Sequence, residues 1–320
     1  MTEDYRAVHG DLCPVIDRQR AIPNEPFGEY RIFQTAERRK YNLRTSGPRI
    51  RDCYLCTRMA SGILVRGRTL VVPDPFPFAA HHFLIRFVGD AHTESIIAPF
   101  VRTRIAAAVQ EHREQLTADD IDRCLTLACE TGFLVCESMR GSGASVPDHI
   151  HAHAFARDVP GALSLPWLKP GSVGLTYQSA DISLYRALTP AYGVLIETKQ
   201  PDAGARVVYT SEILGLPYNL IVGYGEPFRD YWVFVFWRTR ESPRHPLFCH
   251  PATGTWKFGF SEMLGLFEFK SEAQFLGLTE EILAQALLET TIADEVMRER
   301  VERLLRDPPA RSGPHHPWRR

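Results

Sequence analysis

Three histidines at alternate positions give the sequence its clearest chemical signal: His149, His151 and His153, within the run His-Ile-His-Ala-His-Ala-Phe. Alternation with apolar residues predicts a β-strand that presents the three imidazoles on one face. Adjacent imidazoles on a buried face each require a hydrogen-bond partner, a metal ion or a substrate. The preceding loop, residues 143–146, can offer backbone N–H groups to an anion. The pattern therefore favours phosphate chemistry or metal binding.

Three interpretations of this strand compete. A solvated face with incidental histidines is disfavoured, because no other polar residue type shares the histidine register. A metal site on a closed barrel, of the cupin kind, usually adds a glutamate a few residues later, whereas the first carboxylate here is Asp158. The third interpretation is nucleophilic attack by a histidine on a phosphoryl group.

The run from His149 to Phe155 resembles the signature of the histidine-triad superfamily, in which histidines alternate with apolar residues. The longer string Gly-Ala-Ser-Val-Pro-Asp-His-Ile-His, residues 143–151, is similar to the galactose-1-phosphate uridylyltransferase and nucleotide-sugar phosphorylase branch. This resemblance implies an α+β fold of two repeats, each an antiparallel sheet (a half-barrel) flanked by helices. The second repeat is degenerate, because it has no His-x-His pattern.

The resemblance also implies a role for each residue of the site. His151, the middle histidine, attacks the α-phosphorus and carries the nucleotidyl group, and His149 and His153 complete the catalytic triad. Uridylyltransferases and many of the phosphorylases have glutamine at the third position, and an imidazole there can exchange protons where an amide cannot. The loop that stabilises the phosphate oxygens contributes three residues: Gly143, Ala144 and Ser145.

Two arginines are candidates for contacts to the substrate. A basic segment without acidic residues, 38–51, leads into the first cysteine pair; it is either a solvated loop or a cationic contact for phosphate. The resembling phosphorylases also have arginine-bearing sequence there, so Arg39 is predicted to contact phosphate or nucleotide. Arg238 follows an aromatic-rich strand and is predicted to reach the active site, with a solvated hairpin end as the alternative.

Cys53 and Cys56 have the two-residue spacing of half a zinc site. The first triad histidine is a zinc ligand in the zinc-containing uridylyltransferases, so the resemblance adds His149 to the two cysteines. Two thiolates and two imidazoles close the coordination shell, and the Zn2+ is therefore expected to be structural. The fourth ligand comes from one of three histidines: His92, which is predicted, or the alternatives His81 and His82.

The composition excludes several classes of protein. The formal net charge is −1 and the hydrophobic fraction is 44%, which is typical of a globular protein and indicates no general affinity for nucleic acid. We find no apolar run long enough to span a membrane and no signal sequence at the acidic N-terminus. The seven cysteines are an odd number at irregular spacing, so a reducing cytoplasm is expected.

The chain is expected to divide into a catalytic repeat at 1–160, a degenerate repeat at 161–306 and a disordered tail at 307–320. The lead-in, 1–25, is expected to form a short helix, and the first strand should follow at 27–33. Further strands are predicted at 70–73, 82–85, 133–138, 192–197, 218–222, 231–237 and 258–266. Helices are predicted from Thr117 to Gly132 and over 280–305.

The function predicted from these observations is nucleotidyl transfer, as phosphorolysis of a nucleoside diphosphate sugar or a dinucleoside polyphosphate through a covalent nucleotidyl-His151. The acceptor would be phosphate, a sugar phosphate or water. The leading alternative is a histidine-triad nucleotide hydrolase, which His153 favours. A zinc- and nucleotide-binding protein without turnover is a third possibility. Related enzymes are often dimers, so a homodimer is expected.

Overall fold

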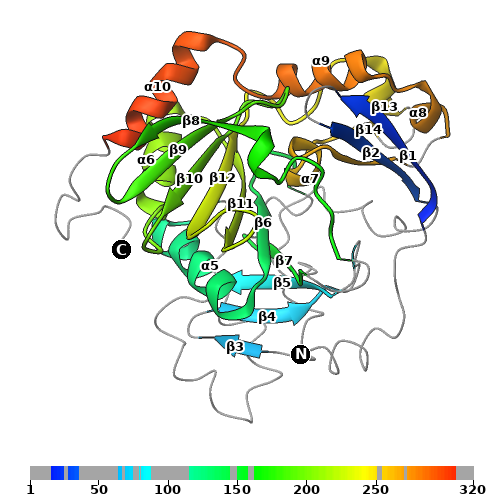
Figure 1. Ribbon diagram of the computed structural model, residues 1–320. Helices are drawn as coiled ribbons and strands as arrows, with labels where there is room; N and C mark the ends of the chain where they lie inside the picture. The colour runs from blue at the N-terminus through cyan, green and yellow to red at the C-terminus, as the bar shows by residue number, and fades with distance from the viewer. Residues whose placement is uncertain are drawn as a thin grey trace.

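A computed structural model describes residues 16–24, 28–35, 64–66, 69–74, 79, 81–87, 115–144, 150–157, 162–250, 254–269 and 272–307. Its central feature is a ten-stranded sheet, in which all neighbouring strands are antiparallel (Figure 1). In spatial order the strands are β3 (Leu64–Arg66), β4 (Thr69–Pro73), β5 (His82–Phe87), β7 (Ala152–Phe155), β6 (Leu134–Ser138), β11 (Tyr218–Tyr224), β12 (Tyr231–Trp237), β10 (Val194–Thr198), β9 (Ile182–Ala187) and β8 (Val173–Gln178).

The two halves of this sheet have the same strand order. Each half has five strands, and the last one in sequence lies between the third and the fourth. In the first half β7 lies between β5 and β6, and in the second half β12 lies between β10 and β11. In each half one helix precedes the fourth strand: α5 (Ala118–Thr131) and α6 (Gly204–Leu214). The halves meet where β6 pairs with β11, so residues on both sides of the expected boundary at 160 share one continuous sheet.

A smaller sheet, β1-β2-β15, lies apart from the large one. β1 (Ile16–Asn24) and β2 (Gly28–Thr35) form an antiparallel hairpin, and β15 (Leu266–Phe269) pairs with β2 in parallel. The described end of the lead-in is therefore a strand and not a helix, because it pairs with β2; residues 1–15 lie outside the described residues. A third, two-stranded sheet joins β13 (Cys249–His250) to β14 (Gly254–Thr255).

The helix that precedes β6 begins and ends where the sequence predicts. Thr117 and Asp120 form a reciprocal capping box at the start of α5. Gly132 ends the helix in the left-handed conformation, with φ of 69°. Short 3-10 turns at Pro170–Ser172 and Pro246–Phe248 lie in the connections of the second half.

The C-terminal part of the chain differs from expectation in two places. The segment 258–266, predicted as a strand, contains the short helix α7 (Phe260–Met263), because the Glu262 carboxylate accepts the Gly259 N–H and starts a helical turn. The single helix predicted over 280–305 is divided into two helices, α9 (Glu280–Thr290) and α10 (Glu295–Arg306). The chain leaves the helical conformation after α9, and Asp294 then caps the start of α10. A further short helix, α8 (Glu272–Gly277), precedes them.

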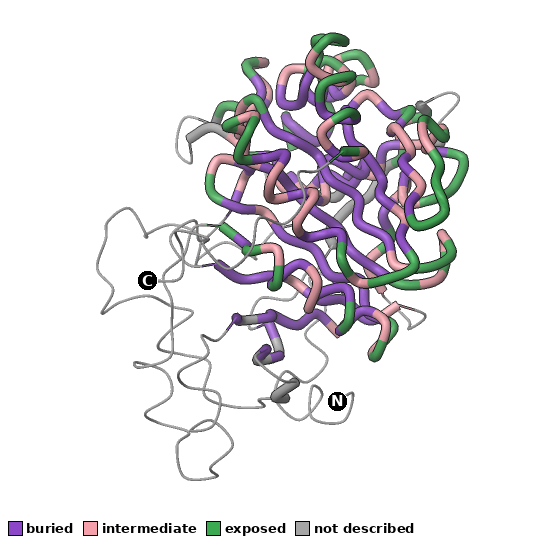
Figure 2. The backbone as a smooth tube through the Cα atoms, turned by 90° about the vertical axis from the view of Figure 1, so that its left-hand side faces the viewer, coloured by how far each residue is buried: buried purple, intermediate pink, exposed green. Residues whose placement is uncertain are grey.

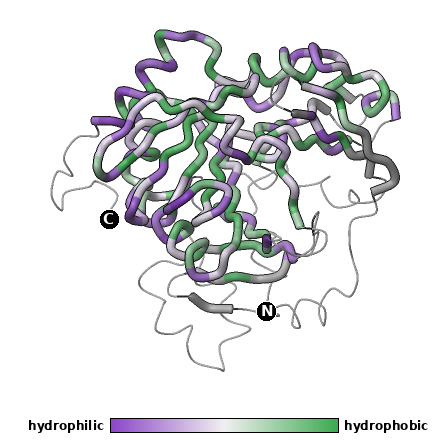
Figure 3. Tube along the Cα trace, viewed as in Figure 1, coloured by the Kyte–Doolittle hydropathy of each residue, from purple (hydrophilic) through white to green (hydrophobic). Residues whose placement is uncertain are grey.

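Two apolar cores lie on opposite faces of the large sheet. One is covered by α5, α6 and α10; the other is covered by β2, β15, α7, α8 and α9. Figure 2 shows the strands buried and the outer turns exposed, and Figure 3 shows apolar residues running through the same strands. Within the described residues, none of the helices combines the length and the hydropathy that a membrane span requires.

Candidate active site

Two of the predicted catalytic histidines, His151 and His153, lie at the start of β7, between β5 and β6. β7 begins at Ala152, so His151 directly precedes the strand and His153 lies within it. His153 is opposite Leu84 of β5 and Cys136 of β6, and its neighbours Ala152 and Ala154 face the other core. Local alternation therefore places the imidazole of His153 on the face that packs against α7.

Asp74, which directly follows β4, and His82, which begins β5, form a cluster with His153. Asp74 and His82 are linked by a backbone hydrogen bond from the Asp74 N–H to the His82 carbonyl, at 3.0 Å. His82 Nε2 lies 2.8 Å from His153 Nδ1 and 3.1 Å from Asp74 Oδ2. His153 Nδ1 lies 3.6 Å from the same carboxylate oxygen. Two ring nitrogens and one carboxylate oxygen thus converge on a small triangle.

Aromatic packing fixes the rings of this cluster. The His82 ring stacks on Phe155 with centroids 4.3 Å apart and planes inclined by 19°. Phe260 of α7 lies against both His153 and Phe155, at centroid distances of 5.8 and 6.1 Å. The His82 side chain is fully buried, whereas 17% of the His153 side chain is exposed. His153 is therefore the member of the cluster through which a substrate can be reached.

His151 is the neighbour of this cluster along the chain. Its ring lies edge-on to that of His153, with centroids 5.1 Å apart and planes at 67°. His151 is 6% exposed, so it is close to the surface without being solvated. The structure thus brings together two of the three predicted catalytic histidines. The third, His149, lies outside the described residues.

Part of the predicted phosphate-binding loop is described, and the second half of the chain holds it in place. Gly143 has φ of 94°, and a Cβ at this position would lie 1.9 Å from the Phe258 carbonyl oxygen. Asn219 of β11 donates from Nδ2 to the Ser142 carbonyl at 2.7 Å and to Ser138 Oγ at 2.9 Å. Ala144 is buried beside them. The loop conformation therefore requires glycine at 143 and the amide of Asn219.

Arg238 belongs to this support and not to the substrate surface. Its side chain is fully buried, and it donates to Asn219 Oδ1 at 2.5 Å, to the Phe258 carbonyl at 2.8 Å and to the Thr290 carbonyl at 2.9 Å. Burial lowers the pKa of Arg238 to about 9, which still leaves the guanidinium charged at neutral pH. The predicted phosphate contact of Arg238 is corrected on this ground, because its donors are directed at protein acceptors.

The remaining predicted site residues lie outside the described residues: Ser145, Arg39, and the zinc ligands Cys53, Cys56, His92 and His149. Asp74 was not among the predicted site residues, and His82 was predicted only as an alternative zinc ligand. One signal was available: Asp74 ends one predicted strand and His82 begins the next, so an antiparallel pairing must bring them together.

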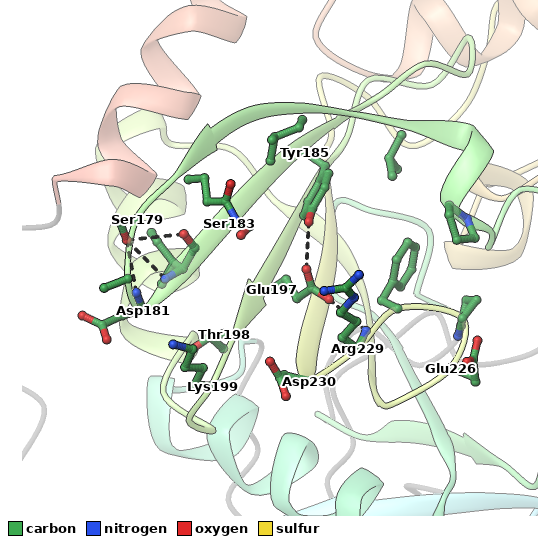
Figure 4. A pocket seen from close by; sticks show the side chains of 18 residues that line it. Ser179, Asp181, Ser183, Tyr185, Glu197, Thr198, Lys199, Glu226, Arg229 and Asp230 are labelled. Atoms are coloured by element: carbon green, nitrogen blue, oxygen red, sulfur yellow. Dashed lines mark hydrogen bonds between the residues drawn. The ribbon is translucent and has the colours of Figure 1, made fainter.

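A separate pocket of about 810 Å³ lies in the second half, formed by β8, β9, β10 and the β11–β12 turn (Figure 4). Glu197 lies within it, where its carboxylate accepts from the Tyr185 hydroxyl at 2.9 Å and from the Arg229 backbone N–H at 2.8 Å. None of the predicted site residues that the structure describes lines this pocket. It is therefore distinct from the histidine cluster.

Comparison with solved structures assigns the fold. Yeast Ap4A phosphorylase Apa2 matches with a TM-score of 0.57 at 13% identity, over 91% of this chain and 96% of that chain. Its complex with AMP gives a TM-score of 0.56, also at 13% identity, over 91% and 93% of the two chains. A uridylyltransferase matches with a TM-score of 0.40 at 14% identity, over 90% and 99%. The predicted resemblance is thus confirmed at the level of the fold, which this chain shares with yeast Ap4A phosphorylase.

Sequence comparisons add nothing to this assignment. No family model matches the chain, and no curated protein matches it.

Proposed function

We propose that this chain is a nucleotidyltransferase of the phosphorylase kind, which cleaves a nucleoside diphosphate sugar or a dinucleoside polyphosphate at the α-phosphate. The observation that carries the proposal is the pair His151 and His153 at the start of β7, with the His153 ring anchored through Nδ1. The fold shared with Ap4A phosphorylase supports it. Because the two halves of the large sheet have the same strand order, we also propose that residues 1–160 and 161–306 are two repeats of one unit.

In the proposed reaction, a ring nitrogen of His151 donates its lone pair to the α-phosphorus, and a phosphorus–nitrogen bond forms. The bond from this phosphorus to the bridging oxygen breaks, and the sugar phosphate or nucleoside phosphate leaves with the electron pair. The contact between His82 and His153 Nδ1 directs Nε2 of His153 away from the protein. This nitrogen can then donate a hydrogen bond to the leaving oxygen.

The loop at 143–145 would supply backbone N–H groups to the non-bridging phosphate oxygens, with the Ser145 hydroxyl beside them. Asn219 and Arg238 position this loop from the second half. In the second step an acceptor oxygen attacks the phosphorus and releases His151. Arg39 remains a proposed phosphate contact. Cys53, Cys56, His92 and His149 remain the proposed ligands of a structural Zn2+.

The experiment that tests the proposal is intact-mass analysis of the full-length chain, without added phosphate. The chain is incubated with a panel of nucleoside diphosphate sugars and dinucleoside polyphosphates. A nucleotidyl adduct on the wild type and none on His151→Ala is expected. Formation of free nucleotide at equal rates by both chains, with no adduct on either, would contradict the proposal.

The acceptor is then identified by adding phosphate, a sugar phosphate or buffer alone to the isolated adduct. Release as a nucleoside diphosphate by phosphate indicates a phosphorylase. Release as a nucleoside monophosphate in buffer alone indicates the second candidate, a hydrolase. The histidine at position 153 favours that second candidate, because an imidazole there can assist water.

A further inference from the structure

The triangle formed by Asp74, His82 and His153 has the chemistry of a metal site. Each residue comes from a different position in the fold: the end of β4, the start of β5 and the interior of β7. Three strands of a rigid sheet therefore set the separation of the three ligand atoms. Two imidazoles with one carboxylate are a ligand set that divalent transition metals use when coordination positions stay open.

The close contact between the two rings requires that at least one nitrogen carries no hydrogen. His82 Nε2 and His153 Nδ1 are 2.8 Å apart, and two N–H groups directed at each other would collide at that distance. Asp74 Oδ2 adds a negative charge within 3.1 Å of the same nitrogen. With both facing nitrogens deprotonated, electron pairs from three atoms would meet at one place, and a cation would stabilise that arrangement.

The dimensions fit such an ion. A point in the plane of three atoms separated by 2.8, 3.1 and 3.6 Å lies roughly 1.9 Å from each of them. Zinc bonds to imidazole nitrogen and carboxylate oxygen are about 2.0–2.2 Å long. An ion at that distance would sit slightly out of the plane. One face of the ion would then remain open to a further ligand, as in three-ligand catalytic sites.

We propose that Asp74, His82 and His153 bind a divalent transition-metal ion, with Zn2+ as the reference ion, at a site separate from the predicted cysteine site. His153 would hold the ion through Nδ1 and would keep its Nε2–H as a fixed donor. The open face would take a water molecule or an oxygen of an anionic ligand such as a phosphate. This site goes beyond the proposed transfer reaction and does not depend on it.

The test measures bound zinc per chain by elemental analysis, after equilibration with Zn2+ and removal of the excess. Four full-length chains are compared: the wild type, Asp74→Asn, His82→Asn and the control His245→Asn. His245 lies outside the triangle, and an asparagine side chain can accept the Leu247 N–H that His245 Nδ1 accepts at 3.3 Å. Because every chain keeps the cysteines, a zinc ion bound there cancels in the comparison.

We expect Asp74→Asn and His82→Asn each to bind one equivalent of zinc less than the wild type, and His245→Asn to bind as much as the wild type. Equal zinc in all four chains, or retention of the ion by either triangle variant, would overturn the proposal. Circular dichroism establishes that the variants are folded. This readout does not involve nucleotide, so its failure is distinguishable from failure of the His151 adduct.

A second measurement leaves the triangle unaltered, in case the buried substitutions prevent folding. X-ray absorption at the zinc edge of the wild-type chain gives the number of sulfur ligands averaged over all bound zinc. The predicted cysteine site alone would give about two sulfur ligands per zinc. An added site without sulfur lowers the average to about one, and the triangle alone gives none. An average of two would overturn the proposal.

Discussion

In the first half of the large sheet, β7 lies between β5 and β6 and presents His153 and Phe155 to the core beside α7. In the second half, β12 lies between β10 and β11 and presents Trp232, Phe234 and Phe236 to the same core. The strand arrangement is equal, but the side chains at corresponding places differ in kind. Phe234 and Phe236 form an aromatic pair with centroids 4.5 Å apart, and packing alone satisfies them.

The difference shows how the chain divides its tasks. Imidazoles on a core face need polar partners, and the first half supplies them at the ends of β4 and β5. Among its described residues, the second half contributes no ligand atom to that cluster, yet it fixes the loop beside it through Asn219 and Arg238. The histidine cluster and the support of the neighbouring loop thus come from different halves of one sheet.

The largest effect is expected when the chemistry of the first half is removed. His151→Ala should lower turnover of the nucleotide substrate by a factor on the order of 10³ or more, because the nucleophile is lost. The matched change in the second half, Phe234→Leu, should leave the chemical step unchanged and lower the free energy of unfolding by about 1–2 kcal/mol. Single-turnover kinetics and urea unfolding of both variants measure the contrast. Similar losses of turnover in both variants would contradict the inference that the chemical step depends on the first half alone.

The next effect comes from the support in the second half. Arg238→Met should lower the free energy of unfolding by about 3–5 kcal/mol, because it leaves the buried acceptors of the guanidinium unpaired. Arg244→Met is the control: this side chain is exposed, and a change within about 0.5 kcal/mol is expected. Urea unfolding measures both. A loss below 1 kcal/mol for Arg238→Met would mean that the buried network contributes little.

A smaller effect is expected at the contact between the halves. Gly143→Ala combines a left-handed backbone with a Cβ that would lie 1.9 Å from the Phe258 carbonyl oxygen. Gly132→Ala also places alanine in the left-handed conformation, but nothing lies within 4 Å of the added Cβ. We expect about 1 kcal/mol of destabilisation for Gly132→Ala and at least about 2 kcal/mol for Gly143→Ala. Thermal unfolding measures the difference, and equal losses would show that the loop can move away from Phe258.

The sequence predicted those parts of the site that are local. Alternation placed His151 and His153 at one strand, and the capping residues Thr117 and Gly132 fixed the bounds of α5. Arg238 was misassigned because a sequence does not reveal that a polar side chain will be surrounded by carbonyl groups from three distant segments. Asp74 was missed for the same reason: its partners come from long-range strand pairing.

The boundary between the halves was predicted from composition, and it is here that local patterns carry least information. Pro and Gly residues mark the connection near 160, but the joint itself is the pairing of β6 with β11, which are about 80 residues apart in sequence. Likewise, the β1–β2–β15 sheet depends on the parallel pairing of β2 with β15, which are far apart in sequence. Such contacts follow from the fold and leave no periodic signal.

The smallest effect concerns a carboxyl group at the junction of the halves. Glu137 of β6 lies opposite Leu220 of β11, and neither of its carboxyl oxygens has a hydrogen-bond partner in the described structure. Burial raises the pKa of Glu137 well above its ordinary value. Two described groups interact with it, Cys124 and Tyr218, and neither is a cation. The folded state therefore retains a proton on Glu137 at pH values where the unfolded chain has lost it.

Between the unfolded and the folded pKa of Glu137, the folded state binds more protons, so the free energy of unfolding falls as the pH rises. Glu137→Gln removes this titration and keeps the shape of the side chain. The variant should gain stability relative to the wild type by up to about 1.4 kcal/mol per pH unit within that window, and the two should converge near pH 4. Urea unfolding at pH 5, 6.5 and 8 measures the gain, with the exposed Glu130→Gln as the control for loss of one charge. A difference that does not grow with pH would mean that a partner outside the described residues holds Glu137 ionised, and the junction would then be polar rather than apolar.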